Sequence, residues 1–410
     1  MNSEYNTERP LIMHIDLNSC FATIEQQSRP LLRGRPVAVV NRRTENTAII
    51  TASYEAKAHG VKVGMRFKEA KLLVPDIIAV ETDPAKYRFV YHKMMDMMKT
   101  YSPHVTMKSI DEGIIDFNHA TDSMKSRDMR DIGQEIKQRL KDEVGSAMRC
   151  NVGISTNRFL AKTAAGLHKP DGLDVIAYDN LRDTFATMRL TDLTGIAKQN
   201  EHRLNAVGID TPLQFLDASA ETLRRMVFKS ICGDEWYQRL RGYEVDDRVF
   251  DMKTAGRQYV LESPHLSRDQ ILQRLHHLAE SVGAKLRSQN KVARGVFVYV
   301  KTHERKYWHA RRMCELPFFS NQAIYALASQ LFAAAPGQIR EIGVSCYELG
   351  DDSDPQLSLF GDKIASEKQL VKVIDELNGR YGDRTVHVAD TLGTGMYVKQ
   401  KIPFGSTRYL

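Results

Sequence analysis

The nine residues SIDEGIIDF, Ser109–Phe117, place two neighbouring acids, Asp111 and Glu112, at the start of an apolar run. The isoleucines that follow are typical of a buried strand. An ionised carboxylate that is buried without a partner costs on the order of several kcal/mol. A surface hairpin with solvated acids avoids that cost, and it is the favoured interpretation of the pair taken alone. The other interpretation is a site where a cation compensates the charge.

A third acid, Asp16, lies near the end of an earlier apolar run, LIMHIDL (Leu11–Leu17), and Asn18 or Ser19 can start a helix behind it. Three converging carboxylates would repel one another, and a divalent cation removes that repulsion. Mg²⁺ prefers carboxylate and carbonyl oxygens and leaves positions open for substrate phosphates. Two such ions about 4 Å apart suit phosphoryl transfer.

The pair itself raises a geometric difficulty. Successive side chains on a regular strand point to opposite faces of the sheet. Asp111 and Glu112 can therefore share one site only if the backbone turns or bulges between them. Gly113 follows directly, and we expect it to mark such a distortion.

Elements alternate along the first 174 residues in an order that predicts a mixed α and β fold rather than a bundle. RPVAVV (Arg35–Val40) and NTAIIT (Asn46–Thr51) read as paired strands, and a helix is expected over about Ser53–His59. A methionine and aromatic stripe at helical spacing predicts another helix whose buried side consists of core residues, Tyr87, Val90, Tyr91, Met94 and Met98.

The second half of the chain has a different texture. Residues 179–248 are helical in pattern, with glycines as breaks. From Gly256 to Tyr347 the order is strand, helix, strand, strand, helix, strand, which predicts a compact sheet with helices on one face. The residues GDDSDP, Gly350–Pro355, are expected to form an acidic linker.

Composition sets the broad class. At about 150 residues per domain, 410 residues suggest about three or four domains. The five cysteines are scattered, so we expect reduced thiols and a cytoplasmic protein without signal peptide or membrane span. Residues 256–347 hold 13 Lys and Arg against 6 Asp and Glu, an excess of +7 that equals the net charge of the whole chain. This stretch is either a solvated basic surface or a nucleic-acid-binding one.

Four motifs in order carry a family resemblance: HIDLNSCFATIE (His14–Glu25), TASYEAKAHGVKVG (Thr51–Gly64), SIDEGIIDF, and NVGISTNRFLAKTAAGLHKPDGL (Asn151–Leu173). Together they resemble the Y-family translesion DNA polymerases of the bacterial polymerase IV and V type. The resemblance implies an α+β multidomain right-hand polymerase with a ferredoxin-like palm. Its domains would be palm 1–27 and 83–174, fingers 28–82, helical thumb 175–250 with a helix-hairpin-helix, βαββαβ little finger 256–348, and a tail 349–410.

The resemblance also implies an activity and a metal site. The expected function is template-directed DNA synthesis of the low-fidelity translesion type, with transfer from a dNTP to a primer 3′-OH in DNA damage tolerance. The family's ligands for two Mg²⁺ ions fall on Asp16, Asp111 and Glu112, with the Leu17 carbonyl as a further ligand. Primer-template DNA and dNTP would be the partners.

Nucleotide contacts follow from the same resemblance. The steric gate against a ribose 2′-OH falls on Phe21, and backbone N–H groups at Ser19, Cys20 and Phe21 would add phosphate contacts. Triphosphate contacts fall on Tyr54, Lys57 and Lys169. Polymerase IV types usually have arginine at position 57, so the fingers motif is mixed, and the bulky Ile50 could narrow which lesions fit.

Two further surfaces are implied. A basic cluster around Tyr307 and Trp308 would grip the DNA backbone, with core packing the favoured role for Trp308 itself; its members are Lys301, Arg305, Lys306, Arg311 and Arg312. QLSLF resembles the bacterial sliding-clamp-binding pentapeptide, with Gln356, Leu357, Leu359 and Phe360 as its contacts.

Two alternatives remain beside this interpretation. One is a non-catalytic polymerase-like scaffold recruited to the sliding clamp, although such relatives lack the three acids present here. The other is a different palm-type enzyme such as a nucleotide cyclase, which would not need the basic domain. A monomer is expected, and the sequence leaves open whether accessory subunits are required.

Overall fold

A computed structural model describes residues 4–248, 251–352 and 361–398, with the side chains of the last range described from residue 366. The described residues divide into two compact units, residues 4–248 and residues 251–398. Each unit is built around its own apolar core. No helix within these ranges is both long enough and apolar enough to cross a bilayer.

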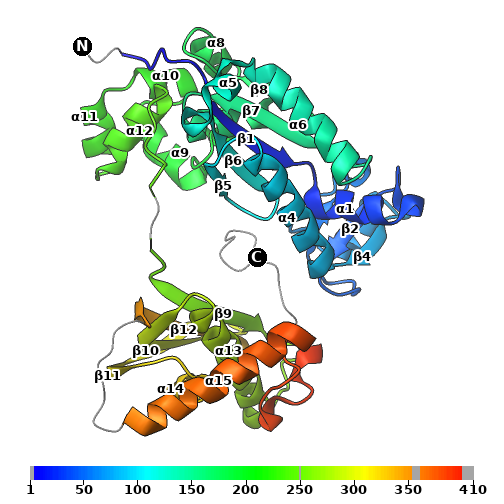
Figure 1. Ribbon diagram of the computed structural model, residues 1–410, viewed down its shortest axis with the longest axis vertical. Coiled ribbons are helices and arrows are strands. Elements are labelled where there is room, and N and C mark those ends of the chain that lie inside the picture. Colours follow the sequence, from blue (N-terminus) through cyan, green and yellow to red (C-terminus); the bar gives the residue numbers. More distant parts are fainter. Residues whose placement is uncertain (1–3, 249–250, 353–360, 399–410) are drawn as a thin grey trace. The chain divides into compact units, whose positions relative to one another are not determined.

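The first unit is organised by a five-stranded sheet in the order β5-β6-β1-β7-β8 (Figure 1). Helices α4 and α6 pack on one face of this sheet, and α7 packs on the other. The order β7-β1-β6-β5, with α4 and α6 as the connecting helices, is that of the ferredoxin-like βαββαβ motif predicted for the palm. The bounds are β1 Ile12–Leu17, α4 Pro84–Lys99, β5 Val105–Met107, β6 Glu112–Asp116, α6 Met129–Glu143, β7 Cys150–Ser155, α7 Arg158–Leu167 and β8 Leu173–Val175.

The core of this sheet lies under α4 and α6. Met13 and Ile15 of β1 point to this side, as the alternation of a strand requires. The predicted stripe on α4 is buried here in full, so its assignment to the core is confirmed. On the opposite face α7 approaches β7 so closely that a Cβ on Gly153 would lie 2.0 Å from the Ala161 carbonyl oxygen. The glycine therefore allows α7 to lie against the sheet.

A small three-stranded sheet forms the insertion between α1 (Cys20–Ser28) and α4. Its strands are β2 (Val37–Val40), β3 (Ile49–Ala52) and β4 (Ile78–Glu81), and β2 pairs antiparallel with β3 as predicted. The side chain of Ser53 caps α2 (Tyr54–Ala58), which confirms the predicted helix. The remaining elements here are α3 (Phe67–Leu73) and the 3₁₀ turn Pro30–Leu32.

Short helices complete the first unit, in agreement with the predicted helical region. They are α8 Leu181–Ala186, α9 Lys198–Asn205, α10 Pro212–Asp217, α11 Ala220–Thr222, a π-helical turn Leu223–Val227 and α12 Cys232–Leu240; α5 Asp122–Ser126 lies earlier, and 3₁₀ turns span Phe117–His119 and Leu190–Asp192.

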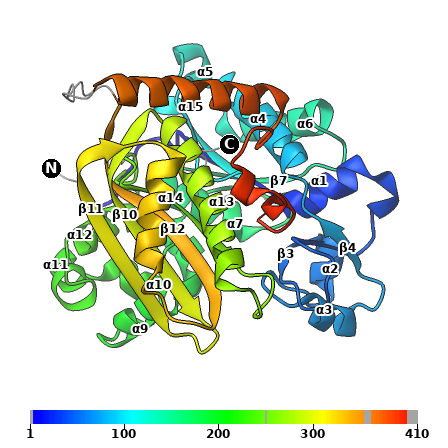
Figure 2. The same ribbon diagram turned by 90° about the horizontal axis from the view of Figure 1, so that it is seen from below.

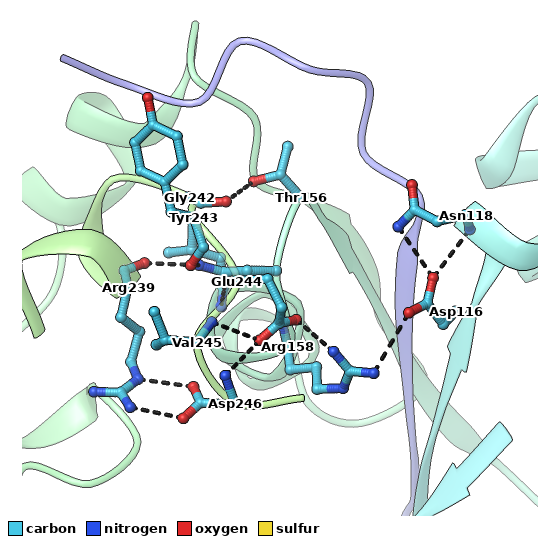
Figure 3. Close-up of polar contacts among 12 residues, drawn as sticks. Asp116, Asn118, Thr156, Arg158, Arg239, Gly242, Tyr243, Glu244, Val245 and Asp246 are labelled. Atoms are coloured by element: carbon cyan, nitrogen blue, oxygen red, sulfur yellow. Dashed lines mark hydrogen bonds and ion pairs between the residues drawn. The ribbon is translucent and has the colours of Figure 1, made fainter. Parts of the chain in front are cut away.

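A polar junction joins these helices to the large sheet (Figure 3). Arg158, at the start of α7, donates to Glu244 at 2.8 Å and lies 3.4 Å from Asp116 of β6. Thr156 donates to the Gly242 carbonyl at 2.8 Å. These contacts tie the end of the helical region to the sheet that carries Asp16 and Glu112.

The second unit has a four-stranded sheet in the order β11-β10-β12-β9, with α13 and α14 packed side by side on one face (Figure 2). The predicted βαββαβ order is confirmed. The bounds are β9 Thr254–Val260, α13 Arg268–Arg287, β10 Lys291–Thr302, β11 Tyr307–Phe318, α14 Asn321–Phe332 and β12 Ile339–Asp351. β12 continues into the expected linker, because Gly350 and Asp351 pair with β10 and Lys291 binds Asp351 at 2.6 Å.

Residues of the expected tail also belong to this unit. The 3₁₀ turns Ala389–Thr391 and Thr394–Met396 lie against α13, and the long helix α15 (Gly361–Tyr381) packs Val371 against Val292 and Phe319. Arg287 of α13 binds Asp375 at 2.6 and 2.8 Å, and His276 contacts Asp390 at 2.9 Å. The described residues of this tail thus form a wall of the second unit, which is called the sheet domain below.

Candidate active site

Asp16 and Glu112 face each other across neighbouring strands. They are register partners in the antiparallel pair of β1 and β6, so both side chains point to the same face of the sheet. His14 lies two residues before Asp16 on that face. Ligand atoms of His14, Asp16 and Glu112 all lie within 4.8 Å of one another. The two acids that the sequence separates by 96 positions thus meet in one site.

Asp111 joins the site from a turn rather than from the strand. The N–H groups of Lys108 and Ser109 both donate to the Glu112 carbonyl, and the Leu17 N–H donates to the Asp111 carbonyl at 2.8 Å. The strand begins only at Glu112, so the predicted turn exists, and Asp111 is its last residue. The expectation that Gly113 marks the distortion was wrong. Gly113 is inside the paired strand, where a Cβ would come within 2.7 Å of the Met107 sulfur.

The surroundings shift the pKa values of the two neighbouring acids, Asp111 and Glu112, in opposite directions. Burial raises the pKa of Asp111, and the charges of Asp16 and Glu112 raise it further against the hydrogen bond from Ser109. Burial also opposes ionisation of Glu112, but hydrogen bonds from His14 and Lys162 outweigh it and hold its pKa at about 2. Of these two neighbours, Asp111 is therefore the one whose ionised form a nearby cation would favour more.

Two lysines neutralise the other acids. The ammonium of Lys162 on α7 lies 2.8 and 2.7 Å from the two oxygens of Glu112, and Lys169 lies 2.8 Å from Asp16. Sequence analysis missed Lys162 and His14. The alternation of β1 could have placed His14 beside Asp16, but nothing local distinguishes Lys162 from a surface lysine.

Asparagines position the loop that carries Lys169. The Asn18 side chain donates to Asn151 at 2.9 Å and accepts from the Asp171 N–H at 2.8 Å. Asn151 also accepts from the Gly172 N–H at 3.2 Å. These bonds fix the loop against the end of β1, which holds Lys169 over Asp16.

The predicted phosphate-binding residues gather beside the acids. Lys57 of α2 donates to the Ser19 hydroxyl at 2.7 Å and lies over the Tyr54 ring at 4.7 Å from its centroid. Burial raises the pKa of Tyr54, which also responds to the charges of Lys169 and Asp16. Burial lowers the pKa of Lys57, and nearby Lys169 lowers it further. The two cations and the phenol thus form one half-buried cluster next to Asp16.

Helix α1 begins at Cys20, directly behind Asp16. Its first-turn N–H groups have no acceptor within the helix, as at every helix start. Phe21 is only 2% exposed, and its ring stacks on Tyr87 with centroids 4.3 Å apart. Burial raises the pKa of the Cys20 thiol, and Asp111 and Asp16 raise it further. Phe21 therefore holds a rigidly packed position, whatever it contacts in a complex.

Comparison with known proteins finds one matching family model in each of the two units. A model of the impB/mucB/samB family matches residues 15–166, and a model of that family's C-terminal domain matches residues 253–359. DNA polymerase IV of Moorella thermoacetica is 32% identical, over 94% of this chain and 97% of its own length. The chain belongs to this family of Y-family DNA polymerases. DNA polymerase IV of Oceanobacillus iheyensis is 28% identical, over 94% and 92% of the two chains.

Solved Y-family structures share the fold. A Dbh-Dpo4-Dbh Y-family DNA polymerase chimera aligns with a TM-score of 0.67 and 22% identity, covering 82% of this chain and 98% of its own. A ternary complex of Dbh DNA polymerase aligns with a TM-score of 0.57 at the same coverage. These likenesses confirm the predicted α+β polymerase architecture.

Y-family polymerases use divalent metal, and the donor set here suits it. Carboxylate oxygens are the preferred ligands of Mg²⁺, and the partly buried Asp111 carboxylate would be stabilised by a compensating charge. The ammonium groups of Lys162 and Lys169 form ion pairs with Glu112 and Asp16, so positive charge is already favoured at this site. The three residues whose ligand atoms lie within 4.8 Å of one another are His14, Asp16 and Glu112, so this group contains His14 in place of the predicted Asp111. The Leu17 carbonyl ligand stays a prediction.

The predicted DNA-binding cluster is divided between the two faces of its sheet. Lys301 pairs with Tyr307, and Phe297 with Arg311, on the face away from α13 and α14. Arg312 pairs with Val296 on the helix side and donates to Gln330 of α14 at 3.0 Å. Trp308 packs into the core, as favoured, while Arg305 and Lys306 lie in the turn between the strands. The clamp motif, residues 356–360, lies outside the described residues.

Proposed function

We propose that this chain extends a DNA primer opposite a template, with Asp16, Asp111 and Glu112 holding two Mg²⁺ ions. The register pairing of Asp16 with Glu112, with Asp111 in the adjoining turn, carries this proposal. When bound, the ions would activate the primer 3′-OH and neutralise charge on the transferred phosphoryl group. The expected reaction forms the bond from that oxygen to the α-phosphorus and releases pyrophosphate.

The residues around the acids would bind the nucleotide. Tyr54, Lys57 and Lys169 form the half-buried cluster described above, and their hydroxyl and ammonium groups suit triphosphate oxygens. Lys169 binds Asp16 when the site lacks a cation, so we infer that it turns to phosphate when a cation neutralises that acid. N–H groups at Ser19, Cys20 and Phe21 add donors.

Phe21 is proposed as the gate against ribonucleotides. Its packing on Tyr87 supports this role, because a fixed ring excludes a 2′-hydroxyl more effectively than a mobile one. The partly buried Ile50 packs against the same core, and we propose that it restricts the space over the templating base. Low fidelity with damage tolerance is the expected outcome for a family member of this type.

The domain roles remain proposals. We assign residues 1–27 and 83–174 as palm, 28–82 as fingers, 175–250 as thumb and 256–348 as little finger. In the thumb, α9 and the turn at Gly195 fit a helix-hairpin-helix that contacts phosphate. In the little finger, Lys301 and Arg311 on the helix-free face are the strongest candidates for the DNA backbone. Sliding-clamp binding through residues 356–360 completes the proposal.

Primer extension by the purified protein tests the catalytic assignment. Asp111→Ala should reduce incorporation by on the order of a hundredfold or more, as for loss of a group that stabilises transition-state charge. Asp122→Ala, at a fully exposed carboxylate, is the matched control and should extend like the wild type. Equal extension by both variants would remove the proposed site. No extension by the wild type would favour a non-catalytic scaffold.

A further inference from the structure

A cavity lies in the sheet domain, apart from the candidate active site. It has a volume of about 410 Å³ between β9, α13 and the segment 383–398. Its polar wall consists of Arg257, His277, Ser281, Asp383, Arg384, His387 and Thr391. Its other wall is apolar and small: Leu392, Gly393, Gly395, Met396 and Val398. A volume of a few hundred Å³ is typical of small-molecule sites.

Arg257 is the central feature of the cavity. It makes no hydrogen bond or ion pair with any residue in the described ranges, and Asp383 is the one acid among the described residues that line the cavity. Burial lowers the pKa of Arg257, although Asp383 counteracts this. A half-buried guanidinium without a hydrogen-bonded partner is costly, because its five donors need acceptors.

A second cation makes the cost larger. Burial lowers the pKa of Lys285 on α13 to about 8, and the charge of Arg257 lowers it further. The Lys285 ammonium donates to the Gly256 carbonyl at 3.4 Å. An anion in the cavity would give the Arg257 guanidinium the acceptors that it lacks among the described residues and would offset part of the local positive charge.

The rest of the polar wall is already fixed. Arg384 is bound by Glu280 and donates to Thr391 at 2.8 Å. His277 contacts the Thr394 hydroxyl at 2.8 Å, and burial together with nearby arginines lowers its pKa to about 3, so its imidazole is neutral. A ligand would therefore meet prearranged groups, which lowers the entropic cost of binding.

We propose that this cavity binds a small phosphate-bearing molecule of about mononucleotide size. The phosphate would lie on Arg257, where a guanidinium offers two parallel donors to oxygens. The apolar wall of Leu392 and Met396 would take a flat, weakly polar group such as a base. The two glycines in that wall leave room for it.

Isothermal titration of the full chain with adenosine 5′-monophosphate, in EDTA, tests the proposal. We expect one saturable site. Arg257→Gln should weaken binding about tenfold or more, the effect of removing a charge-assisted hydrogen bond. Adenosine, which lacks the phosphate, should bind weaker by a similar factor. Ser281→Phe, which fills the cavity from α13, should also abolish binding.

Controls separate this cavity from the candidate active site. Lys57→Gln should leave the binding unchanged, and so should Arg294→Gln, at an exposed arginine of the same sheet domain. Thermal unfolding of each variant checks its folding. The proposal is overturned if Lys57→Gln removes the binding, if Arg257→Gln and Ser281→Phe both bind normally, or if adenosine binds equally well. It is also overturned if Arg257 affects only binding of a 5′-phosphorylated oligonucleotide.

Discussion

The Lys162 ammonium bridges both carboxylate oxygens of Glu112, at 2.8 and 2.7 Å, from the helix that covers this face of the sheet. Glu112 is a proposed metal ligand. Without a cation, its carboxylate is bound by the side chain of Lys162. The lysine keeps the acid ionised and oriented before any cation arrives. It also competes with that cation for the same oxygens.

Lys162→Met should destabilise the metal-free protein by about 1–2 kcal/mol, because a half-buried carboxylate loses its ion pair. The folded-state pKa of Glu112, now about 2, should rise toward its usual 4.5. The difference in unfolding free energy between the wild type and the variant is therefore largest above about pH 4.5, and it declines as the pH falls toward 2. Thermal unfolding with and without MgCl₂ should show a larger Mg²⁺-induced rise in Tm for the variant. An identical rise in both proteins would contradict competition.

Asp111→Asn should abolish primer extension and yet stabilise the protein in EDTA. The folded-state pKa of Asp111 is raised, so ionising it costs folding free energy as the pH rises through that value. The variant should therefore exceed the wild type in urea unfolding at pH 7, and the gain should shrink in acid. Saturating Mg²⁺ should remove it. A variant less stable than the wild type at pH 7 would refute the desolvation argument.

Phe21→Leu should admit ribonucleotides, because the smaller side chain opens space at the proposed gate. We expect the ratio of kcat/KM for rATP to that for dATP to rise about tenfold or more. Its ring is buried against Tyr87, so the variant should also lose about 1–2 kcal/mol of stability. An unchanged ratio in a folded variant would show that Phe21 is solely a core residue.

Arg158→Ala should loosen the helical region from the large sheet. Arg158 and Asp116 are nearly buried, and the substitution leaves Asp116 and Glu244 without this cation. We expect a loss of about 2–4 kcal/mol in urea unfolding. Arg182→Ala breaks an exposed pair with Asp217 and should cost at most about 1 kcal/mol. Equal losses would show that the ion pairs of the junction in Figure 3 stabilise the protein no more than an exposed ion pair does.

The sequence predicted elements better than it predicted their partners. Strands, capped helices and the buried stripe on α4 follow from local pattern, and they formed as expected. The pairing of Asp16 with Glu112 depends on a register between strands 96 residues apart, which local pattern does not encode. The family resemblance supplied that step.

Other features were beyond local pattern for the same reason. Lys162 becomes part of the site only because α7 lies across the strands. Adjacent arginines at 311 and 312 looked like one cluster, but strand alternation sends them to opposite faces. The acidic stretch from Gly350 was expected to be a linker, but its first two residues, Gly350 and Asp351, pair in strand β12, where Lys291 lies 2.6 Å from Asp351.

The wall formed by α15 and the turns after it has a practical bearing on shortened versions of the protein. Glu280 accepts from Arg384, Thr391 and the Val388 N–H, and Arg287 binds Asp375, so α13 keeps its polar groups satisfied through residues near the carboxyl end. A truncation after Asp352 would leave these groups on α13 without those partners. Loss of activity in such a truncation would then reflect a destabilised sheet domain. A defect in sliding-clamp binding could be assigned only from point substitutions in residues 356–360 that leave this wall intact.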